Sequence, residues 1–127
     1  MTSGFEPSGL LGRYHLLEGG LRLRLRLARS SDAEAMGRLV AAHGGDGVGF
    51  QTGSLVHYDP RRRCVICASA LINSTETLVG VGVIELDGDD SAAPQLLIVD
   101  ARCAGVADLL TDALVARGRE AARARAA

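Results

Sequence analysis

The 127-residue sequence contains no lysine and no tryptophan, and it has only two phenylalanines and two tyrosines. Without lysine, the chain has neither a side-chain amine for Schiff-base chemistry nor the lysine of a phosphate-binding P-loop. All 14 basic residues are therefore arginines, and 15 acidic residues bring the formal net charge to −1. We do not expect a near-neutral chain with so few rings for base stacking to bind nucleic acid.

Cysteines and long apolar runs are also scarce. The sequence has three cysteines, no N-terminal apolar signal segment and no apolar run of roughly 18 residues, the length of a membrane-spanning helix. We therefore expect a cytoplasmic protein that makes no contact with membranes. Cys64 and Cys67 form a C-x-x-C pair inside an apolar, strand-like run, where residues three apart point to opposite faces of a sheet. This placement predicts two buried thiols and no metal site.

The N-terminal residues differ in composition from the rest of the chain. Residues 1–9 are aperiodic and carry Gly, Ser and Pro, and residues 10–20 are apolar but close with Gly19 and Gly20. We expect residues 1–20 to form a flexible tail and a short arm. Residues 21–127 belong to a chain that is 47% hydrophobic, and they are expected to fold as one domain.

The first part of this domain predicts a strand followed by a helix. Leucine and arginine alternate over residues 21–27, the pattern of a half-buried strand with its arginines on one face. The capping pattern Ser31-Asp-Ala-Glu34 then begins a helix that ends at Gly44.

The second part predicts three strands and another helix. Apolar runs over residues 64–71 and 77–86 flank turn-forming residues, so these two strands should pair antiparallel. Residues 95–99 are nearly all apolar, which predicts a strand buried on both faces at the centre of the sheet. An apolar stripe predicts a helix over residues 104–123. Together the elements predict an α/β (α+β) fold with a mixed, mostly antiparallel sheet of about four strands and two main helices.

The last predicted strand leads directly into the last predicted helix through Arg102-Cys-Ala-Gly-Val-Ala107. The first N–H groups of a helix have no partner within the helix, and the positive end of the helix dipole lies behind them. A junction of this kind therefore favours binding of a phosphate group.

Three segments of the chain resemble the GNAT family of N-acetyltransferases. They are Leu23-Arg-Leu-Arg-Leu-Ala-Arg-Ser-Ser-Asp-Ala-Glu-Ala35, the strand Thr77-Leu-Val-Gly-Val-Gly-Val-Ile-Glu-Leu86, and residues 102–107 as an R-x-x-G-x-A sequence. The resemblance covers residues 21–123.

The resemblance implies acetyl-coenzyme A as co-substrate. In the family, the R-x-x-G-x-A loop cradles the pyrophosphate of coenzyme A with backbone amides, and the preceding strand pairs with the pantetheine arm. By position, the pantetheine-facing residues are Leu97, Ile98 and Val99. The pyrophosphate loop is then formed by Arg102, Cys103, Ala104, Gly105, Val106 and Ala107.

The family continues beyond this helix with another strand and a helix that often carries a tyrosine acid. The sequence given ends at Ala127, so the resemblance implies a GNAT-like half or incomplete domain. Gln95 stands where many members carry a glutamate base, and the first candidate base in this chain is Glu85, with Asp100 second. The arginines at 61–63 are interpreted first as a solvated turn and second as contacts for the cofactor's phosphates.

Two functions stay open at this point. The first is an acyl-coenzyme A-binding N-acetyltransferase domain that acts on an unidentified amine, or a catalytically degenerate relative of one. The second is a non-catalytic interaction or assembly module built on the same partial fold. The outer edge of the strand at 95–99 has no later strand to pair with, so either the arm or a second copy should cover it. We favour a homodimer.

Overall fold

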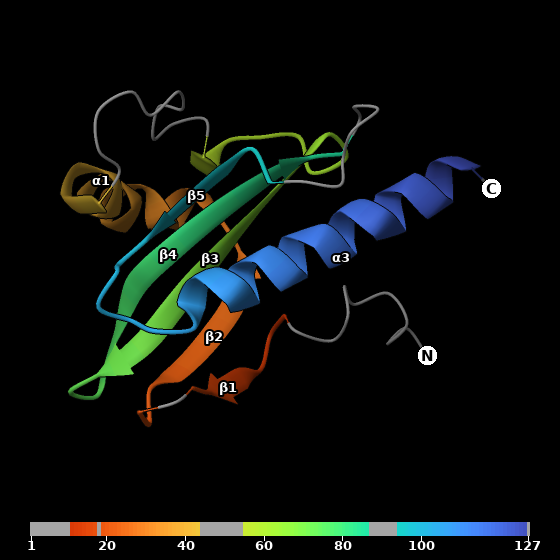
Figure 1. Cartoon of the computed structure of the whole chain (residues 1–127). Helices are drawn as coiled ribbons and strands as arrows, with labels where there is room; N and C mark the ends of the chain where they lie inside the picture. The colour runs from red at the N-terminus through yellow and green to blue at the C-terminus, as the bar shows by residue number, and fades with distance from the viewer. Residues whose placement is uncertain (1–10, 18, 44–54, 87–93, 127) are drawn as a thin grey trace.

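The computed structural model of the chain describes residues 11–17, 19–43, 55–86 and 94–126. These residues form an antiparallel sheet of five strands, which lie side by side in sequence order. One helix packs on each face of the sheet (Figure 1). The strands are β1 (Tyr14–Leu16), β2 (Arg22–Leu27), β3 (Arg63–Ile72), β4 (Thr75–Glu85) and β5 (Leu96–Val99), and the helices are α1 (Ala33–His43) and α3 (Val106–Ala126). The predicted α+β class is confirmed, and the fifth strand comes from the arm.

The sheet separates two hydrophobic cores, and the alternation of side chains along each strand decides which core a residue joins. Leu23 and Leu25 of β2 are fully buried beneath α3. Cys64 lies in the same core, whereas Cys67 lies in the core beneath α1, as the spacing predicts. Burial raises the pKa of the Cys64 thiol to about 11 and that of Cys67 to about 12, so both stay protonated and unreactive near neutral pH.

Two glycines in β4 allow α3 to approach the sheet closely. A Cβ atom on Gly80 would lie 2.9 Å from Cδ1 of Leu110, and one on Gly82 would lie 2.5 Å from Cδ1 of Leu114. Real Cβ contacts essentially never come this close. The space that the glycines leave is therefore filled by leucine side chains of α3 rather than by a ligand.

A carboxylate from a different residue than predicted fixes the start of α1. A short 3-10 turn over Ser30–Asp32 precedes the helix, and Oδ2 of Asp32 accepts the backbone N–H of Arg29 at 2.7 Å. The same carboxylate binds Arg26 through two hydrogen bonds of 2.8 Å. The capping pattern predicts that Glu34 accepts a backbone N–H at the start of the helix. Instead, Oε2 of Glu34 lies 3.5 Å from Nη1 of Arg38. The buried ion pair with β2 explains why Asp32 is preferred, since only this carboxylate also ties the helix to the sheet.

The strand β5 lies at the edge of the sheet, so the prediction of a central strand is wrong. It pairs with β4, and no strand among the described residues pairs with its other side. Only Ile98 is buried, and Leu97 remains 39% exposed. A run of apolar residues does not distinguish a central strand from an edge strand that lies between two helices, because both helices contribute burial in either case.

The N-terminal arm covers the opposite edge of the sheet. Its strand β1 pairs antiparallel with β2, with Tyr14 opposite Arg24 and Leu16 opposite Arg22. The expectation that the arm folds over β5 is therefore wrong, which leaves the second copy as the expected cover. The predicted tail at residues 1–9 and the helix end at Gly44 lie outside the described residues.

Candidate functional site

The junction between β5 and α3 is organised by Asp100. Its backbone N–H donates to the carbonyl oxygen of Val79, the extra residue of a β-bulge in β4. Oδ1 of Asp100 accepts the backbone N–H and Nε of Arg102, both at 3.0 Å, and Oδ2 accepts Nη2 of Arg102 at 2.7 Å. These hydrogen bonds hold the pKa of the Asp100 carboxyl well below its usual range, so the group is ionised near neutral pH.

Gly105 makes the turn that leads into α3. Its φ of +89° lies in the left-handed region, which residues with a Cβ rarely adopt. The nearest atoms to a Cβ placed there belong to Leu17 of the arm, at 3.7 Å, so the constraint on this position is its backbone conformation rather than lack of space. The sequence therefore needs glycine here for the loop to meet the helix.

The N-terminal end of α3 presents a group of unpaired donors. Among the described residues, no hydrogen-bond acceptor lies opposite the backbone N–H groups of Ala104, Gly105, Ala107 and Asp108. The helix that begins here is 21 residues long, and the positive end of its dipole coincides with these groups. The arrangement can hold an anionic oxygen without any side chain.

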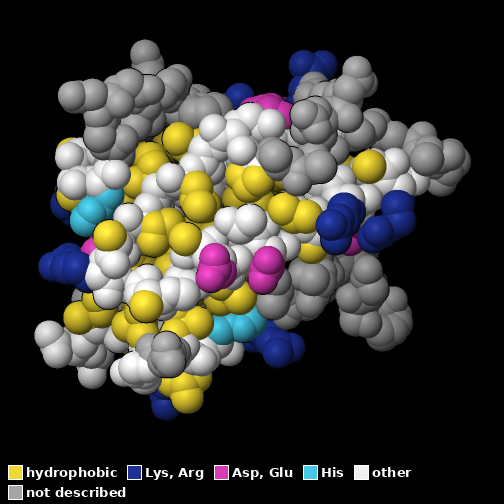
Figure 2. Space-filling view, in the orientation of Figure 1, with side chains coloured by type: hydrophobic (Ala, Val, Ile, Leu, Met, Phe, Trp, Pro, Cys, Tyr) yellow, Lys and Arg dark blue, Asp and Glu magenta, His cyan; other side chains and the backbone are white. Residues whose placement is uncertain are grey.

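Charged side chains modify this end of the helix. Figure 2 shows acidic side chains over the first half of α3 and basic ones over its second half. Asp108 and Asp112 are exposed in the first half, and Arg119 and Arg123 are exposed in the second. This distribution of charges stabilises the helix, because each charge interacts favourably with the nearer end of the helix dipole. The carboxylate of Asp108, however, would repel an anion bound at the same terminus.

The structure brings most of the predicted cofactor-binding residues together. Arg102, Ala104 and Gly105 are exposed on the loop, Cys103 is half-buried, and Ala107 is half-buried in the first turn. Val106, the first residue of α3, is fully buried against the sheet, so only its backbone could contact a ligand. The strand residues Leu97, Ile98 and Val99 run along β5 directly before the loop. Ile98 packs into the core beneath α1, whereas Val99 packs against the core beneath α3.

Glu85, the first candidate base, lies away from this junction. Gly80 is the β4 residue opposite Val99, whereas Glu85 lies at the other end of β4, opposite Arg63. Oε2 of Glu85 accepts Nε of Arg63 at 2.7 Å, and the side chain of Gln95 accepts the Glu85 backbone N–H. Asp100, the second candidate, belongs to the junction itself.

The arginines at 61–63 also lie apart from the loop. Arg61 pairs with Asp59 in an exposed turn, with 3.2 Å between Nε and Oδ1, and Arg63 pairs with Glu85. The exposed Arg61 matches the interpretation as a solvated turn, whereas Arg63 is a half-buried residue at the start of β3.

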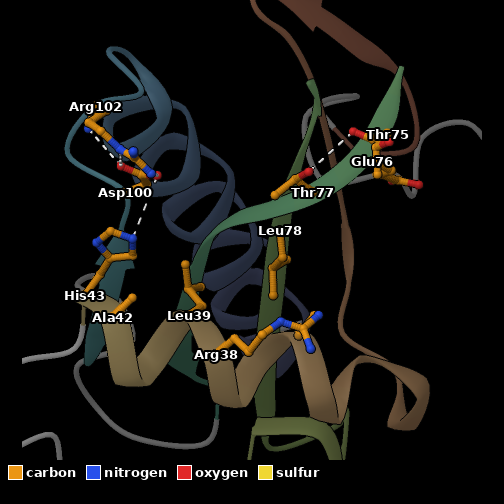
Figure 3. A pocket seen from close by; sticks show the side chains of 11 residues that line it. Arg38, Leu39, Ala42, His43, Thr75, Glu76, Thr77, Leu78, Asp100 and Arg102 are labelled. Carbon is orange, nitrogen blue, oxygen red and sulfur yellow. Dashed lines mark hydrogen bonds and ion pairs between the residues drawn. The ribbon is translucent and has the colours of Figure 1, made fainter. Parts of the chain in front are cut away.

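A groove of about 360 Å³ opens on the sheet face that carries α1 (Figure 3). It runs between α1 and the start of β4, and it reaches the loop at Asp100 and Arg102. Nε2 of His43, at the end of α1, lies 3.8 Å from Oδ2 of Asp100. Sequence reasoning missed the groove residues His43, Arg38 and Glu76 as a group, because no motif joins positions so far apart in the chain.

Besides the loop before α3 and the groove, we looked for membrane-spanning helices, metal sites and related proteins. No helix of the described part is long and apolar enough to cross a membrane. No group of three or more His, Cys, Asp or Glu side chains in the described ranges is arranged to hold a metal ion. Comparison of the chain with protein-family models, curated proteins and solved structures finds no match.

Proposed function

We propose that this chain is an acyl-coenzyme A-binding, GNAT-like domain that acts as an N-acetyltransferase. The observation that carries the proposal is the set of four unpaired backbone N–H groups at the N-terminal end of α3. The pyrophosphate of the cofactor would accept hydrogen bonds from these groups in the field of the helix dipole. Gly105 lets the backbone approach the phosphate without an intervening Cβ.

The strand β5 supports the rest of the cofactor. Its outer edge has no strand partner among the described residues, so its backbone N–H and C=O groups can pair with an extended chain of amides. The pantetheine arm of coenzyme A is such a chain. Leu97, which is 39% exposed on β5, offers an apolar contact beside it.

The second candidate is a non-catalytic assembly module that uses the same edge. The observation that favours it is also the open side of β5, because an unpaired edge strand is a template for a strand of another chain. A second copy is the economical partner, since two β5 strands can pair antiparallel across a two-fold axis. The two candidates use the same surface and are therefore expected to exclude each other.

Calorimetric titration with acetyl-coenzyme A tests the first candidate. Ala107→Pro removes one of the four unpaired N–H groups without removing a hydrogen bond of the helix, because proline is tolerated in the first helical turn. We expect this variant to bind acetyl-coenzyme A at least about tenfold more weakly. Ala107→Ser, which keeps the N–H, serves as the matched control and should bind as the unaltered chain does.

Thermal unfolding of both variants separates a loss of binding from a loss of fold. The absence of both heat and thermal stabilisation at millimolar acetyl-coenzyme A would overturn the proposal for the unaltered chain. Equal affinity of the proline and serine variants would show that the cofactor binds elsewhere.

A further inference from the structure

The face of α3 that points away from the sheet carries four exposed charges in one stripe. Asp108 and Asp112 lie in the first half of the helix and Arg119 and Arg123 in the second half, with the half-buried Val115 between them. Successive members are three or four residues apart, so all of them belong to one face of the helix. Figure 2 shows this face, on which acidic and basic side chains gather at different places along α3. The stripe is about 22 Å long.

The four charges have no ion-pair partner within the part of the chain that the structure describes. Like charges are instead neighbours along the helix, because the two aspartates are four residues apart, and so are the two arginines. Neighbours of like charge at this spacing destabilise a helix. A single copy of the chain therefore leaves all four charges uncompensated by side chains.

The helix dipole accounts for only the outer charges of the stripe. Its influence falls off within the first and last turns of a helix. Asp108 lies in the first turn, but Asp112 lies about two turns into α3 and Arg119 about two turns before its end. The two inner charges therefore need another explanation.

A second copy of α3 in antiparallel orientation matches the stripe at both charged ends. About a two-fold axis beside Val115, Asp112 faces Arg119 of the second copy. Asp108 then faces Arg123 of the second copy, because both pairs are centred on the same point of the helix. The two-fold axis repeats each contact, so every aspartate of the stripe meets an arginine.

We propose that two copies of the chain associate through antiparallel contact of their α3 helices. Val115 of each copy forms the centre of the contact, and the ion pairs lie on either side of it. The contact is one helix wide and its charges are exposed, so the association is weak, with a Kd of about 0.1–1 mM at low salt. The outer edge of β5 is a separate surface, so a chain that pairs through both surfaces builds assemblies larger than a dimer at high concentration.

Sedimentation equilibrium between about 10 µM and about 1 mM measures the association through α3. The background is Leu97→Arg, in which a charge opposes pairing through β5. No cofactor is present, so the result does not depend on the proposed function. We expect a monomer at the lowest concentration that approaches a dimer at the highest, and about 0.5 M NaCl should raise the Kd at least about fivefold by screening the exposed charges. A monomer at every concentration, or an assembly larger than a dimer, overturns the proposal.

Charge reversal in this background identifies the surfaces that meet. Asp112→Arg places an arginine opposite Arg119 of the second copy, and Arg119→Asp places an aspartate opposite Asp112. Each variant alone should associate at least about tenfold more weakly than the background chain. An equal mixture of the two variants should restore the association, because each reversed charge then meets one of opposite sign. A mixture that associates no better than its components overturns the proposal.

Glu34→Arg and Arg38→Asp are the matched controls. They make the same changes of net charge on α1, which packs on the other face of the sheet, and the two side chains are 88% and 70% exposed. Neither control should alter the association, and their mixture should show no gain. Equal weakening by the controls would assign the effect to net charge and overturn the contact along α3.

Thermal unfolding shows whether each variant is folded. The same charge reversals in the chain with Leu97 intact give a second readout that does not require Leu97→Arg to fold. There, Asp112→Arg should limit assembly at high concentration to the dimer that pairs through β5, and its mixture with Arg119→Asp should restore larger species. Identical masses for the unaltered chain, Asp112→Arg and the mixture at about 1 mM would overturn the proposal.

Discussion

Asp100 holds Arg102 through both the backbone and the side chain of the arginine, and it also faces His43 across the groove. Its Oδ1 atom accepts the Arg102 backbone N–H and Nε, while Oδ2 lies between Nη2 of Arg102 and Nε2 of His43. One nearly buried carboxylate therefore fixes the loop before α3 and forms the wall of the groove on the other side of the sheet. The two candidate sites share this residue.

Asp100→Asn should make the chain less stable by about 1 kcal/mol near neutral pH, because the amide oxygen is a weaker acceptor for the loop than the carboxylate. The pKa of Asp100 is depressed in the folded chain, so its contribution to stability is fully present above the unfolded-state pKa of about 4 and is lost as the pH falls toward the lower folded-state pKa. Denaturant unfolding of both chains at several pH values should therefore show the difference shrinking only below about pH 4.

Asp112→Asn is the control for this measurement, because that side chain is exposed on α3. Its effect on stability should be smaller at every pH. A stability difference for Asp100→Asn that is the same at pH 7 and at about pH 2 would contradict the role of the ionised carboxylate.

Asp108→Asn should strengthen binding of acetyl-coenzyme A by roughly two- to fivefold at low salt, because it removes a negative charge from the terminus that would hold the phosphate. The same substitution should destabilise the free chain slightly, since a carboxylate in the first turn stabilises the helix dipole. Opposite signs of the two effects, measured by calorimetry and by thermal unfolding, identify the helix terminus as the anion site. Asp112→Asn, one turn further along, should change the affinity less.

Gly82→Ala should destabilise the chain by about 1–3 kcal/mol, because its Cβ would overlap Leu114 of α3 in a packed core. Leu114→Ala removes that overlap and leaves a cavity of its own. The double variant should therefore be more stable than the sum of the two single losses predicts. Denaturant unfolding of the four chains measures this coupling, and strict additivity would show that α3 does not rest on Gly82.

The elements with strong local signals could be predicted from the sequence. The alternation of leucine and arginine defines β2, and the apolar stripe with acidic residues early and basic residues late defines α3. The junction at Gly105 could be found because a glycine between a strand and a helix is a local feature. The short strand β1 was missed, since its three residues carry no periodic pattern and gain their order from pairing with β2.

Relationships between distant residues could not be predicted. The position of β5 at the sheet edge depends on how two helices share the faces of the sheet, which local apolarity does not encode. His43 and Asp100 lie on different elements, and their proximity follows from the packing of α1 against β4 and β5. The capping residue Asp32 was likewise selected by its ion pair with Arg26 on a neighbouring strand.

The edge of β5 gives the last prediction, which concerns assembly. A strand of four residues is itself short enough to limit pairing, but Leu97 adds an exposed apolar side chain to this edge. We expect a homodimer at micromolar concentration that acetyl-coenzyme A dissociates, because the pantetheine arm and the second copy compete for the same backbone groups. Leu97→Arg should give a monomer, since two like charges would meet across the two-fold axis. Light scattering with and without the cofactor measures both effects. A monomer mass for the unaltered chain, or a dimer that persists in Leu97→Arg, would exclude pairing through β5.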